Sequence, residues 1–228
     1  IGFVLGPCIN ASGRLDTAAR SLALLNAKTK EEAARLAGDL TALNQSRKAL
    51  TEKGKEEAIR IIETTELKND RVLVVYLPDC HESLAGIIAG RIREKYHRPA
   101  FVLTGGETSA KGSGRSIESY SMYEELVKCA DLMIQFGGHP MAAGLSIEEK
   151  NIEEFRRRLN VNCTLTDEEL RPKIVIDVPM PVSYITKELV EQISLLEPFG
   201  KGNAKPVFAQ KNLRVLKTGI YGKTQNTV

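Results

Sequence analysis

The stretch RVLVVYLP, Arg71 to Pro78, decides the fold. It is a continuous apolar run that follows the polar break KND and ends at a proline, with no alternation of apolar and polar residues. Such runs are typical of strands that are buried on both faces, in sheets that carry helices on either side. The sequence therefore predicts a central strand here, within an α/β domain.

Helices and strands are expected to alternate after this run. A Gly- and Ser-rich stretch and a glycine pair at Gly137 interrupt the pattern without ending it. Strands that alternate with helices indicate an α/β domain with a mixed sheet. The expected elements are a helix at 84–96, a strand at 99–104, a helix at 119–130, a strand at 143–147 and a helix at 149–160.

The segment before the run is expected to form one long helix over residues 29–64, with Gly54 as a possible break. At 1.5 Å per residue such a helix would extend on the order of 50 Å, which suits a connector between two lobes. A coiled-coil dimer is the alternative, but the pattern is short and Ala-rich for that structure. Four leucines lie at helical spacing: Leu36, Leu40, Leu43 and Leu50.

The first residues have a different character. The motif GPCINASGRL is expected to form a turn, and the chain is expected to become helical near Thr17, with Asp16 as the helix cap. The chain starts at Ile1 rather than Met and stops at Val228 just after an expected strand. We therefore expect both ends to be cut, so that residues which complete a site lie outside this sequence.

A third kind of sequence begins at Arg171. The stretch RPKIVIDVPMPVSYI contains three prolines, and LLEPFGKGNAKPVFA contains Gly and Pro residues that are typical of turns, just before the expected strands. Strands are expected at 206–210 and 213–218. This pattern predicts the start of another, β-rich unit.

Composition excludes several classes of protein. Apolar residues make up 42% of the chain, and no run approaches the roughly 20 apolar residues that cross a bilayer, so no membrane association is expected. The four cysteines form no C-x-x-C pair, which argues against a zinc or redox motif and fits a reducing cytoplasm. The net charge is only +3, so any anion site must be local.

Two donor-rich stretches lie near expected element ends. In NASGR, which begins at Asn10, Gly13 permits a sharp turn and the Arg14 guanidinium offers a planar fork of donors for a phosphate, although an Arg after Gly more often caps a helix or pairs structurally. In HESLAGIIAG, His81 follows the strand that ends near Pro78, at the sheet edge where α/β proteins usually bind ligands. For His81, a ligand role and a structural role are equally favoured; for Gly86 and Gly90, close packing is the favoured explanation.

A third stretch is AKGSGRS. In an extended strand alternate residues face the same way, so Lys111, Ser113 and Arg115 are expected on one side, with Ser116 following. Two cations and a hydroxyl on one face are costly to bury without an anion. A solvated edge strand is the second interpretation, since edge strands rarely contain two glycines in this way.

The fourth stretch is QFGGHPMAAGLSI. Gly137 and Gly138 can take positive φ, and Pro140 suits the first turn of a helix. Together they predict a tight turn whose amides form an anion-binding nest beside His139. A lone histidine is more often structural, but these neighbours favour a phosphate ligand.

Other catalytic motifs are missing. There is no Walker lysine motif, G-x-G-x-x-G, nucleophile elbow or H-E-x-x-H, which argues against nucleotide-triphosphate, dinucleotide, acyl-transfer and zincin chemistry. The four stretches also lack acidic clusters for Mg²⁺ or Mn²⁺, so no metal ligands are expected in this chain. The sequence thus predicts a phosphate-binding site without a metal centre.

These motifs, in this order and at these spacings, resemble the RecJ family of bacterial single-strand-specific DNA exonucleases, in the DHH phosphoesterase superfamily. The matching stretches are GPCINASGRL, HESLAGIIAGRI, KGSGRSI, GGHPMAAGLSI and EPFGKGNAKPVF. The resemblance covers nearly the whole chain. It implies four parts: residues 1–27 as the end of the catalytic DHH domain, 28–66 as a connector helix, 67–163 as a DHH-associated domain, and 172–228 as an incomplete OB-fold.

The resemblance also implies a function. Such enzymes hydrolyse single-stranded DNA from its 5′ end in repair and recombination, using Mn²⁺ or Mg²⁺ held by Asp and His residues of the DHH domain, which would precede Ile1. Arg115 and His139 would face that centre across a cleft and hold substrate phosphates, and Asn10 and Arg14 match the motif that ends the catalytic domain. Single-strand-binding protein or a helicase would be a partner, and this region alone would be inactive.

Two other functions stay open at this point. One is a related DHH phosphodiesterase that acts on short RNA or cyclic dinucleotides, although such proteins normally end after the GGH domain. The other is a non-catalytic nucleic-acid-binding module, like the DHH-associated domain of alanyl-tRNA synthetases. An Asp-His-His motif before Ile1 would separate the exonuclease from the binding module.

Overall fold

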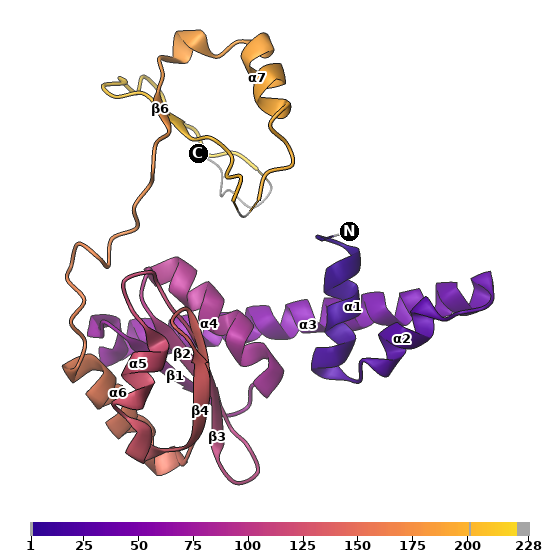
Figure 1. Ribbon diagram of the computed structural model, residues 1–228, viewed down its shortest axis with the longest axis vertical. Coiled ribbons are helices and arrows are strands. Elements are labelled where there is room, and N and C mark those ends of the chain that lie inside the picture. Colours follow the sequence, from indigo (N-terminus) through magenta and orange to yellow (C-terminus); the bar gives the residue numbers. More distant parts are fainter. Residues whose placement is uncertain (1, 201, 223–228) are drawn as a thin grey trace. The chain divides into compact units, whose positions relative to one another are not determined.

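The computed structural model describes residues 2–200 and 202–222, so Lys201 in the EPFGKGN motif and residues 223–228 of the expected OB-fold lie outside the described residues. The chain divides into two compact units, residues 1–172 and 173–228. Figure 1 shows the elements of each unit. The helices are α1 (Leu5–Leu15), α2 (Ala19–Leu25), α3 (Lys30–Thr64), α4 (Glu82–Tyr96), α5 (Met122–Val127), α6 (Ile152–Val161) and α7 (Lys187–Ser194).

The first unit contains a five-stranded sheet in the order β1-β2-β3-β5-β4. Strands β1 and β2 pair in parallel and the other neighbours pair antiparallel, so the predicted mixed sheet is confirmed. The central apolar run forms β1, as predicted. The strands are β1 (Leu73–Leu77), β2 (Ala100–Thr104), β3 (Ala110–Arg115), β4 (Met133–His139) and β5 (Ala142–Ile147).

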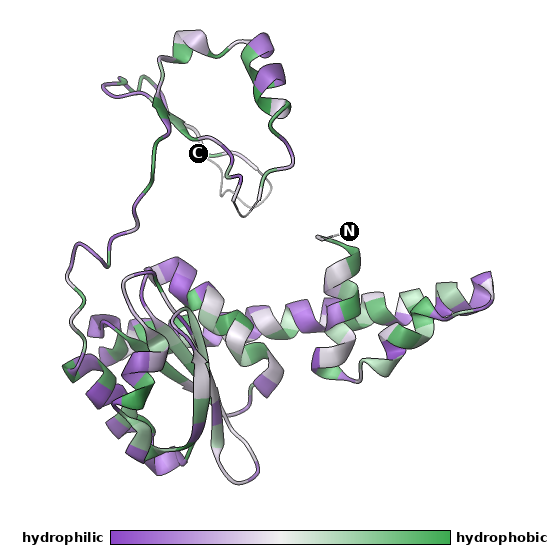
Figure 2. Cartoon of the chain, in the orientation of Figure 1, coloured by the Kyte–Doolittle hydropathy of each residue, from purple (hydrophilic) through white to green (hydrophobic). Residues whose placement is uncertain are grey.

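Helices cover both faces of β1 and β2. On one face, α3 and α4 supply buried side chains such as Ile62 and Ile88. On the other, α5 and α6 supply Met122, Leu126 and Phe155. Burial on both faces explains why the sequence of β1 is continuously apolar. Figure 2 shows apolar residues in the strands and mixed hydrophilic and apolar residues along α3.

The long helix α3 is confirmed and runs from Lys30 to Thr64 without the possible break at Gly54. Thr29 caps its N-terminus by accepting a hydrogen bond from the Glu32 amide at 3.2 Å. The helix packs against α1 and α2 along one part and against α4 and β1 along another. The contact between α3 and α4 is close at Gly54, because a Cβ there would lie 2.6 Å from Cδ1 of the buried Ile88 and would force that side chain to move.

The expected turn in GPCINASGRL is wrong. These residues form α1, and Asp16 lies at its C-terminal end rather than capping a following helix. Burial of Ala11 and Ser12 favours the helix, and the Ser12 hydroxyl lies 2.7 Å from that of Ser21 on α2. Packing against neighbouring helices therefore overrides the turn preference of the glycines in this segment.

The second unit is small and open. Strands β6 (Val178–Pro179) and β7 (Phe208–Ala209) pair in parallel. The strand expected at 206–210 corresponds to β7, whereas no strand is described at 213–218, and α7 was not predicted. None of the described residues from 173 onward is buried. This unit therefore has little core of its own in the part of the chain that is described.

Candidate anion-binding site

One face of the sheet brings together donors from several of the predicted stretches. Lys111, Ser113 and Arg115 alternate along β3 and share the face against which α4 packs, as predicted from the strand periodicity. The second interpretation, a solvated edge strand, is wrong, because β3 lies between β2 and β5. The first turn of α4 and β3 line a hollow of about 310 Å³. Its lining residues are Glu82, Ser83, Ala85, Lys111, Gly112, Ser113 and Leu145.

Arg115 and His139 lie in one row across the sheet. Both residues pair with Ala142 of β5, one from each side. Neighbouring strands lie about 4.8 Å apart, so the two backbones are about 10 Å apart with only a small residue between them. The next row has Ser113, Gly144 and Gly137, of which both glycines are exposed. The two donor side chains therefore flank an open floor of small residues.

Arg115 is a partly buried cation without an acidic partner among the described residues. Its Nη1 donates to the Ser113 hydroxyl at 3.1 Å and to the Gly114 carbonyl at 2.7 Å. Burial lowers the pKa of Arg115, and the nearby charges of Arg14 and Arg93 lower it further. Arg93 pairs with Glu94 at 3.5 Å, but Arg115 itself has no carboxylate partner among the described residues, so an anion beside it would stabilise its charge.

The N-terminus of α4 adjoins this cluster. Arg14 reaches it from α1, and its Nη1 donates to the Ser83 carbonyl at 2.7 Å. His81 is the N-cap of α4, and its Nδ1 accepts a hydrogen bond from the Ser83 amide at 3.3 Å. This geometry favours the structural role of His81, since one ring nitrogen is already used in the cap.

Lys111 has a partner that the sequence did not reveal. Its Nζ lies 2.6 Å from Oε2 of Glu82, and both side chains are about half exposed. An acidic residue of the same chain therefore balances the charge of Lys111, and its role in phosphate binding stays a prediction. Arg115 is the partly buried cation of this face that has no such neighbour.

The glycine pair lies in a strand rather than in a turn. Gly137 and Gly138 are part of β4, the edge strand that pairs with β5, so the expected nest and helix start are wrong. The hairpin turn is formed by Pro140 and Met141. Gly138 has φ of 153°, and a Cβ there would lie 2.6 Å from the Ala143 Cα, so this position requires glycine.

His139 ends β4 with an exposed side chain. No atom lies within 4 Å of a Cβ built at Gly137, two residues before it on the same face. The space beside His139 is therefore open to a ligand. The imidazole can approach a group that rests on the floor between it and Arg115.

Two other predicted residues lie apart from this face. Ser116 is buried, and its hydroxyl donates to the Tyr120 carbonyl at 2.6 Å, so it is used inside the fold. Asn10 is exposed on α1. Neither residue adds a donor to the floor between Arg115 and His139.

Sequence reasoning missed Arg93 and did not connect Gly86 with Arg115. Gly86 and Arg93 lie on the face of α4 that meets β3. The charge of Arg93 lowers the pKa of Arg115, and a Cβ at Gly86 would lie 2.7 Å from Arg115 Nη2. Positions 86, 90 and 93 are spaced so that they share one face of a helix, and this spacing was visible in the sequence. The spacing alone does not indicate which strand that face contacts.

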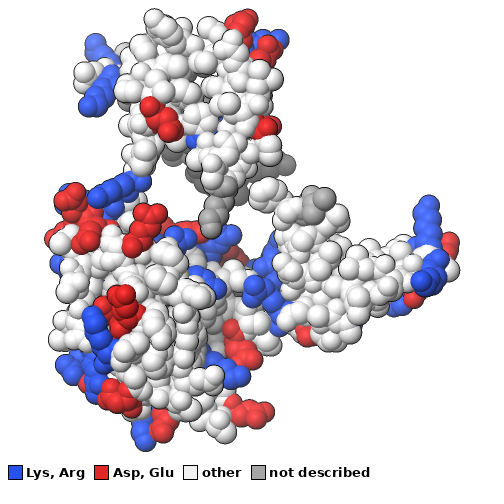
Figure 3. All heavy atoms as spheres, in the orientation of Figure 1, with Lys and Arg blue, Asp and Glu red and all other residues white. Residues whose placement is uncertain are grey.

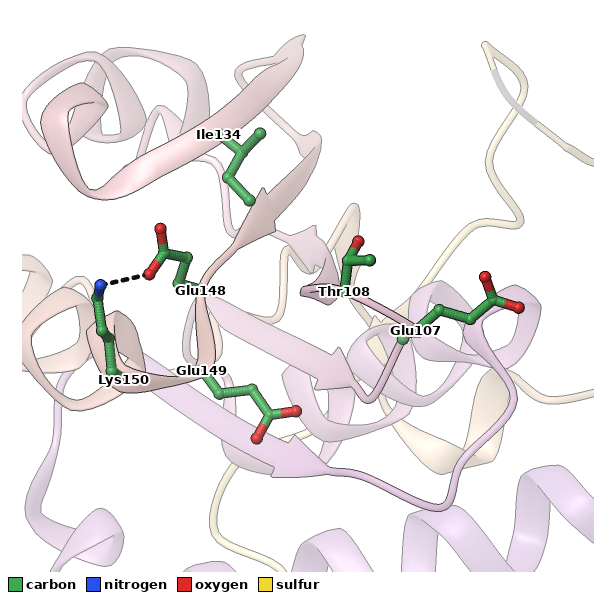
Figure 4. Close-up of a pocket in the computed structure, with 7 residues that line it drawn as sticks. Glu107, Thr108, Ile134, Glu148, Glu149 and Lys150 are labelled. Atoms are coloured by element: carbon green, nitrogen blue, oxygen red, sulfur yellow. Dashed lines mark ion pairs between the residues drawn. The ribbon is translucent and has the colours of Figure 1, made fainter.

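Two other cavities have a different chemistry. One of about 470 Å³ is lined by Glu107, Glu148 and Glu149 together with Lys150, which pairs with Glu148 at 2.6 Å (Figure 4). Its carboxylates disfavour an anion. The other, of about 570 Å³, lies between α3 and the β1–α4 loop and has an apolar lining with charged side chains around it.

Charges of both signs are interspersed over the face that Figure 3 shows. This agrees with the small net charge and with a local rather than a general anion site. Among residues 2–200 and 202–222, no three or more His, Cys, Asp or Glu side chains come together to hold a metal ion. Within the same ranges, no helix has the length and apolarity needed to span a membrane.

Comparisons with known proteins match this region to characterised domains. Residues 69–163 match the model of the DHHA1 domain, and residues 176–228 match that of the RecJ OB domain. The single-stranded-DNA-specific exonuclease RecJ of Salmonella typhimurium is 36% identical over 98% of this chain. The Bacillus subtilis protein of the same name is 36% identical over 90% of this chain.

Solved structures give the same result. The crystal structure of Thermus thermophilus RecJ in complex with Mg²⁺ superposes with a TM-score of 0.77 at 30% identity, over 90% of this chain and 32% of that one. The complex with Mn²⁺ gives 0.76 at 30% identity, over 91% of this chain and 31% of that one. The chain spans 40% of the Salmonella relative and 27% of the Bacillus relative.

Proposed function

Because the chain belongs to the RecJ family, as a partial region with its DHHA1 and OB domains, we propose that it supplies the substrate-phosphate site of a single-strand-specific DNA exonuclease. One observation carries this proposal. Arg115, a partly buried cation without an acidic partner among the described residues, shares an open row of the sheet with His139. Such a row suits the phosphates of an extended strand.

The chemistry of phosphodiester hydrolysis explains what this row does. Attack on phosphorus increases the negative charge on the oxygens of the reacting phosphate. Donors fixed before the reaction stabilise that charge without reorganisation. Arg115 offers planar paired donors and His139 offers a ring N–H, so together they orient the strand and neutralise its charge.

Divalent metal ions enter the proposal from the relatives. The Thermus RecJ structures contain Mg²⁺ or Mn²⁺. The described residues of this chain do not fit a metal centre, since they form no group of three His, Cys, Asp or Glu. We therefore propose that the metal ligands belong to the catalytic DHH domain of the whole protein, and that this region alone does not cleave DNA.

The proposed domain arrangement follows the same reasoning. Residues 1–27 form the last helices of the DHH domain, 28–66 the connector, 67–163 the DHH-associated domain and 172–228 part of an OB-fold. The side chains of Phe3, Leu22 and Leu25 support the first assignment, since all three are more than 60% exposed and suit burial against a further domain.

Further parts of the proposal rest on the family resemblance. They are hydrolysis from the 5′ end, a role in DNA repair and recombination, a cytoplasmic location, and contact with single-strand-binding protein or a helicase. The match of residues 176–228 to the RecJ OB domain supports the exonuclease over the short-RNA phosphodiesterase and the non-catalytic module.

Binding of a labelled single-stranded oligonucleotide to the chain tests the proposal, with Arg115→Ala and His139→Ala compared across a salt series. We expect binding that weakens with salt and falls on the order of tenfold in each variant. Arg91→Ala is the matched control, because Arg91 is exposed on α4 and pairs with Glu94 at 3.0 Å. Equal binding by all four proteins would contradict the proposal.

A further inference from the structure

Gly86 lies where α4 passes over the side chain of Arg115. A Cβ built at Gly86 would lie 2.7 Å from Arg115 Nη2, 3.3 Å from Arg115 Cζ and 2.8 Å from the Ser113 hydroxyl oxygen. All three atoms belong to side chains that can move, and none to the backbone. A methyl group at this position would therefore displace the guanidinium while leaving the helix and the strand in place.

The hydrogen bonds of Arg115 define which of its donors remain for a ligand. Its Nη1 donates to Ser113 and to the carbonyl of Gly114, which uses both hydrogens of that nitrogen. Nε and Nη2 have no acceptor among the described residues. This pair of nitrogens forms the edge of the guanidinium that binds phosphate in a bidentate manner.

We propose that Gly86 is a positioning residue for this edge: its lack of a side chain leaves the space in which Arg115 and Ser113 lie together and keep Nε and Nη2 available to a substrate phosphate. The inference rests on the proposed function, because it needs Arg115 to bind phosphate. It adds a residue of α4, on a different element from the donors themselves.

The helix itself gives no reason for a glycine at this position. Glycine inside a helix is less stable than alanine, and Gly86 is in the second turn of α4. Gly90 provides a comparison one turn later. A Cβ at Gly90 would lie 4.0 Å from Arg115 Cγ, so a methyl group fits there in ordinary contact. The two glycines therefore predict opposite results for the same substitution.

The test measures binding of a fluorescent, 5′-phosphorylated oligothymidylate to the full chain and to four variants. These are Gly86→Ala, Gly90→Ala, Arg115→Ala, and Gly86→Ala combined with Arg115→Ala. We expect Arg115→Ala to weaken binding on the order of tenfold, Gly86→Ala about fivefold and Gly90→Ala less than about twofold. The double variant should bind as weakly as Arg115→Ala alone, because Gly86 acts through Arg115.

Thermal unfolding followed by circular dichroism accompanies the binding data. Both glycine variants should melt at or above the temperature of the unsubstituted chain, since alanine favours the helix. If Arg115→Ala weakens binding but Gly86→Ala does not, the inference is wrong and the proposed function stands. If Gly86→Ala weakens binding equally with and without Arg115, its effect is structural and the inference is also wrong. If Arg115→Ala has no effect, the proposed function itself fails.

Discussion

At the scale of single residues, the site depends on which cations have partners. Arg115 has only neutral hydrogen-bond partners, whereas Lys111 pairs with Glu82 at 2.6 Å. Glu82 therefore places a negative charge at the hollow beside Ser113. A carboxylate in this place repels phosphate and occupies a cation that could otherwise bind it.

The substitution Glu82→Gln should strengthen binding of a single-stranded oligonucleotide. It removes a negative charge and frees Lys111, and exposed charges at this distance change affinity by roughly two- to fivefold. Fluorescence anisotropy at low salt measures the change, which should shrink as salt is added.

Glu153→Gln is the control for this prediction. Glu153 is exposed on α6, which packs on the opposite face of the sheet, and pairs with Arg156 at 2.8 Å. The Glu153→Gln substitution removes the same charge far from the hollow and should leave the affinity for the oligonucleotide unchanged. Weaker or equal binding by Glu82→Gln would show that Lys111 does not contribute to the site.

At the scale of elements, α3 and α4 meet at a close contact beside Gly54. Gly54 faces the buried Ile88 of α4, and Cys80 Sγ lies 3.6 Å from the position of its missing Cβ. Burial raises the pKa of the Cys80 thiol, which is consistent with its place beside this contact. The contact fixes α3 against the helix that carries one wall of the site.

Alanine at Gly54 should therefore destabilise the fold by about 1–3 kcal/mol, because overpacking a core contact costs more than the helix gains. Unfolding in urea, followed by circular dichroism, gives the free energy of unfolding.

Gly38→Ala is the matched control in the same helix. Nothing lies within 4 Å of a Cβ at Gly38, so this variant should gain about 0.5–1 kcal/mol. A Gly54→Ala protein as stable as the Gly38→Ala protein would show that the two helices separate at little cost.

At the scale of the whole molecule, the core belongs to the first unit. The two clusters of buried apolar residues lie between residues 58 and 165, and no described residue from 173 onward is buried. The first unit therefore contains the apolar burial needed to fold by itself. It also contains each donor of the candidate site.

Limited trypsin digestion should cut first near Arg171, where the backbone is exposed and forms no helix or strand. The resulting fragment of about residues 1–171 should keep its melting temperature and its oligonucleotide affinity within about twofold, since the site lies inside it. Mass spectrometry identifies the first cut and anisotropy measures binding. A first cut within the sheet would contradict an independently folded first unit, and loss of binding in the fragment would show that the site needs residues beyond 171.

Sequence alone determined the features that depend on near neighbours. The apolar run of β1, the helical spacing of α3 and the alternation that places Lys111, Ser113 and Arg115 on one side all follow from local periodicity. The family motifs were also visible in the sequence, because they combine residue types with fixed spacing.

Only the tertiary structure decided which of these residues meet. Glycine is not favoured in strands, so the sequence around Gly137 predicted a turn. In the structure Gly137 lies in a strand because it pairs with β5, which follows it in the chain. The Glu82–Lys111 pair and the place of Gly86 against Arg115 depend on how α4 crosses β3. These contacts join residues far apart in the chain, and their geometry follows from packing of whole elements rather than from any local pattern.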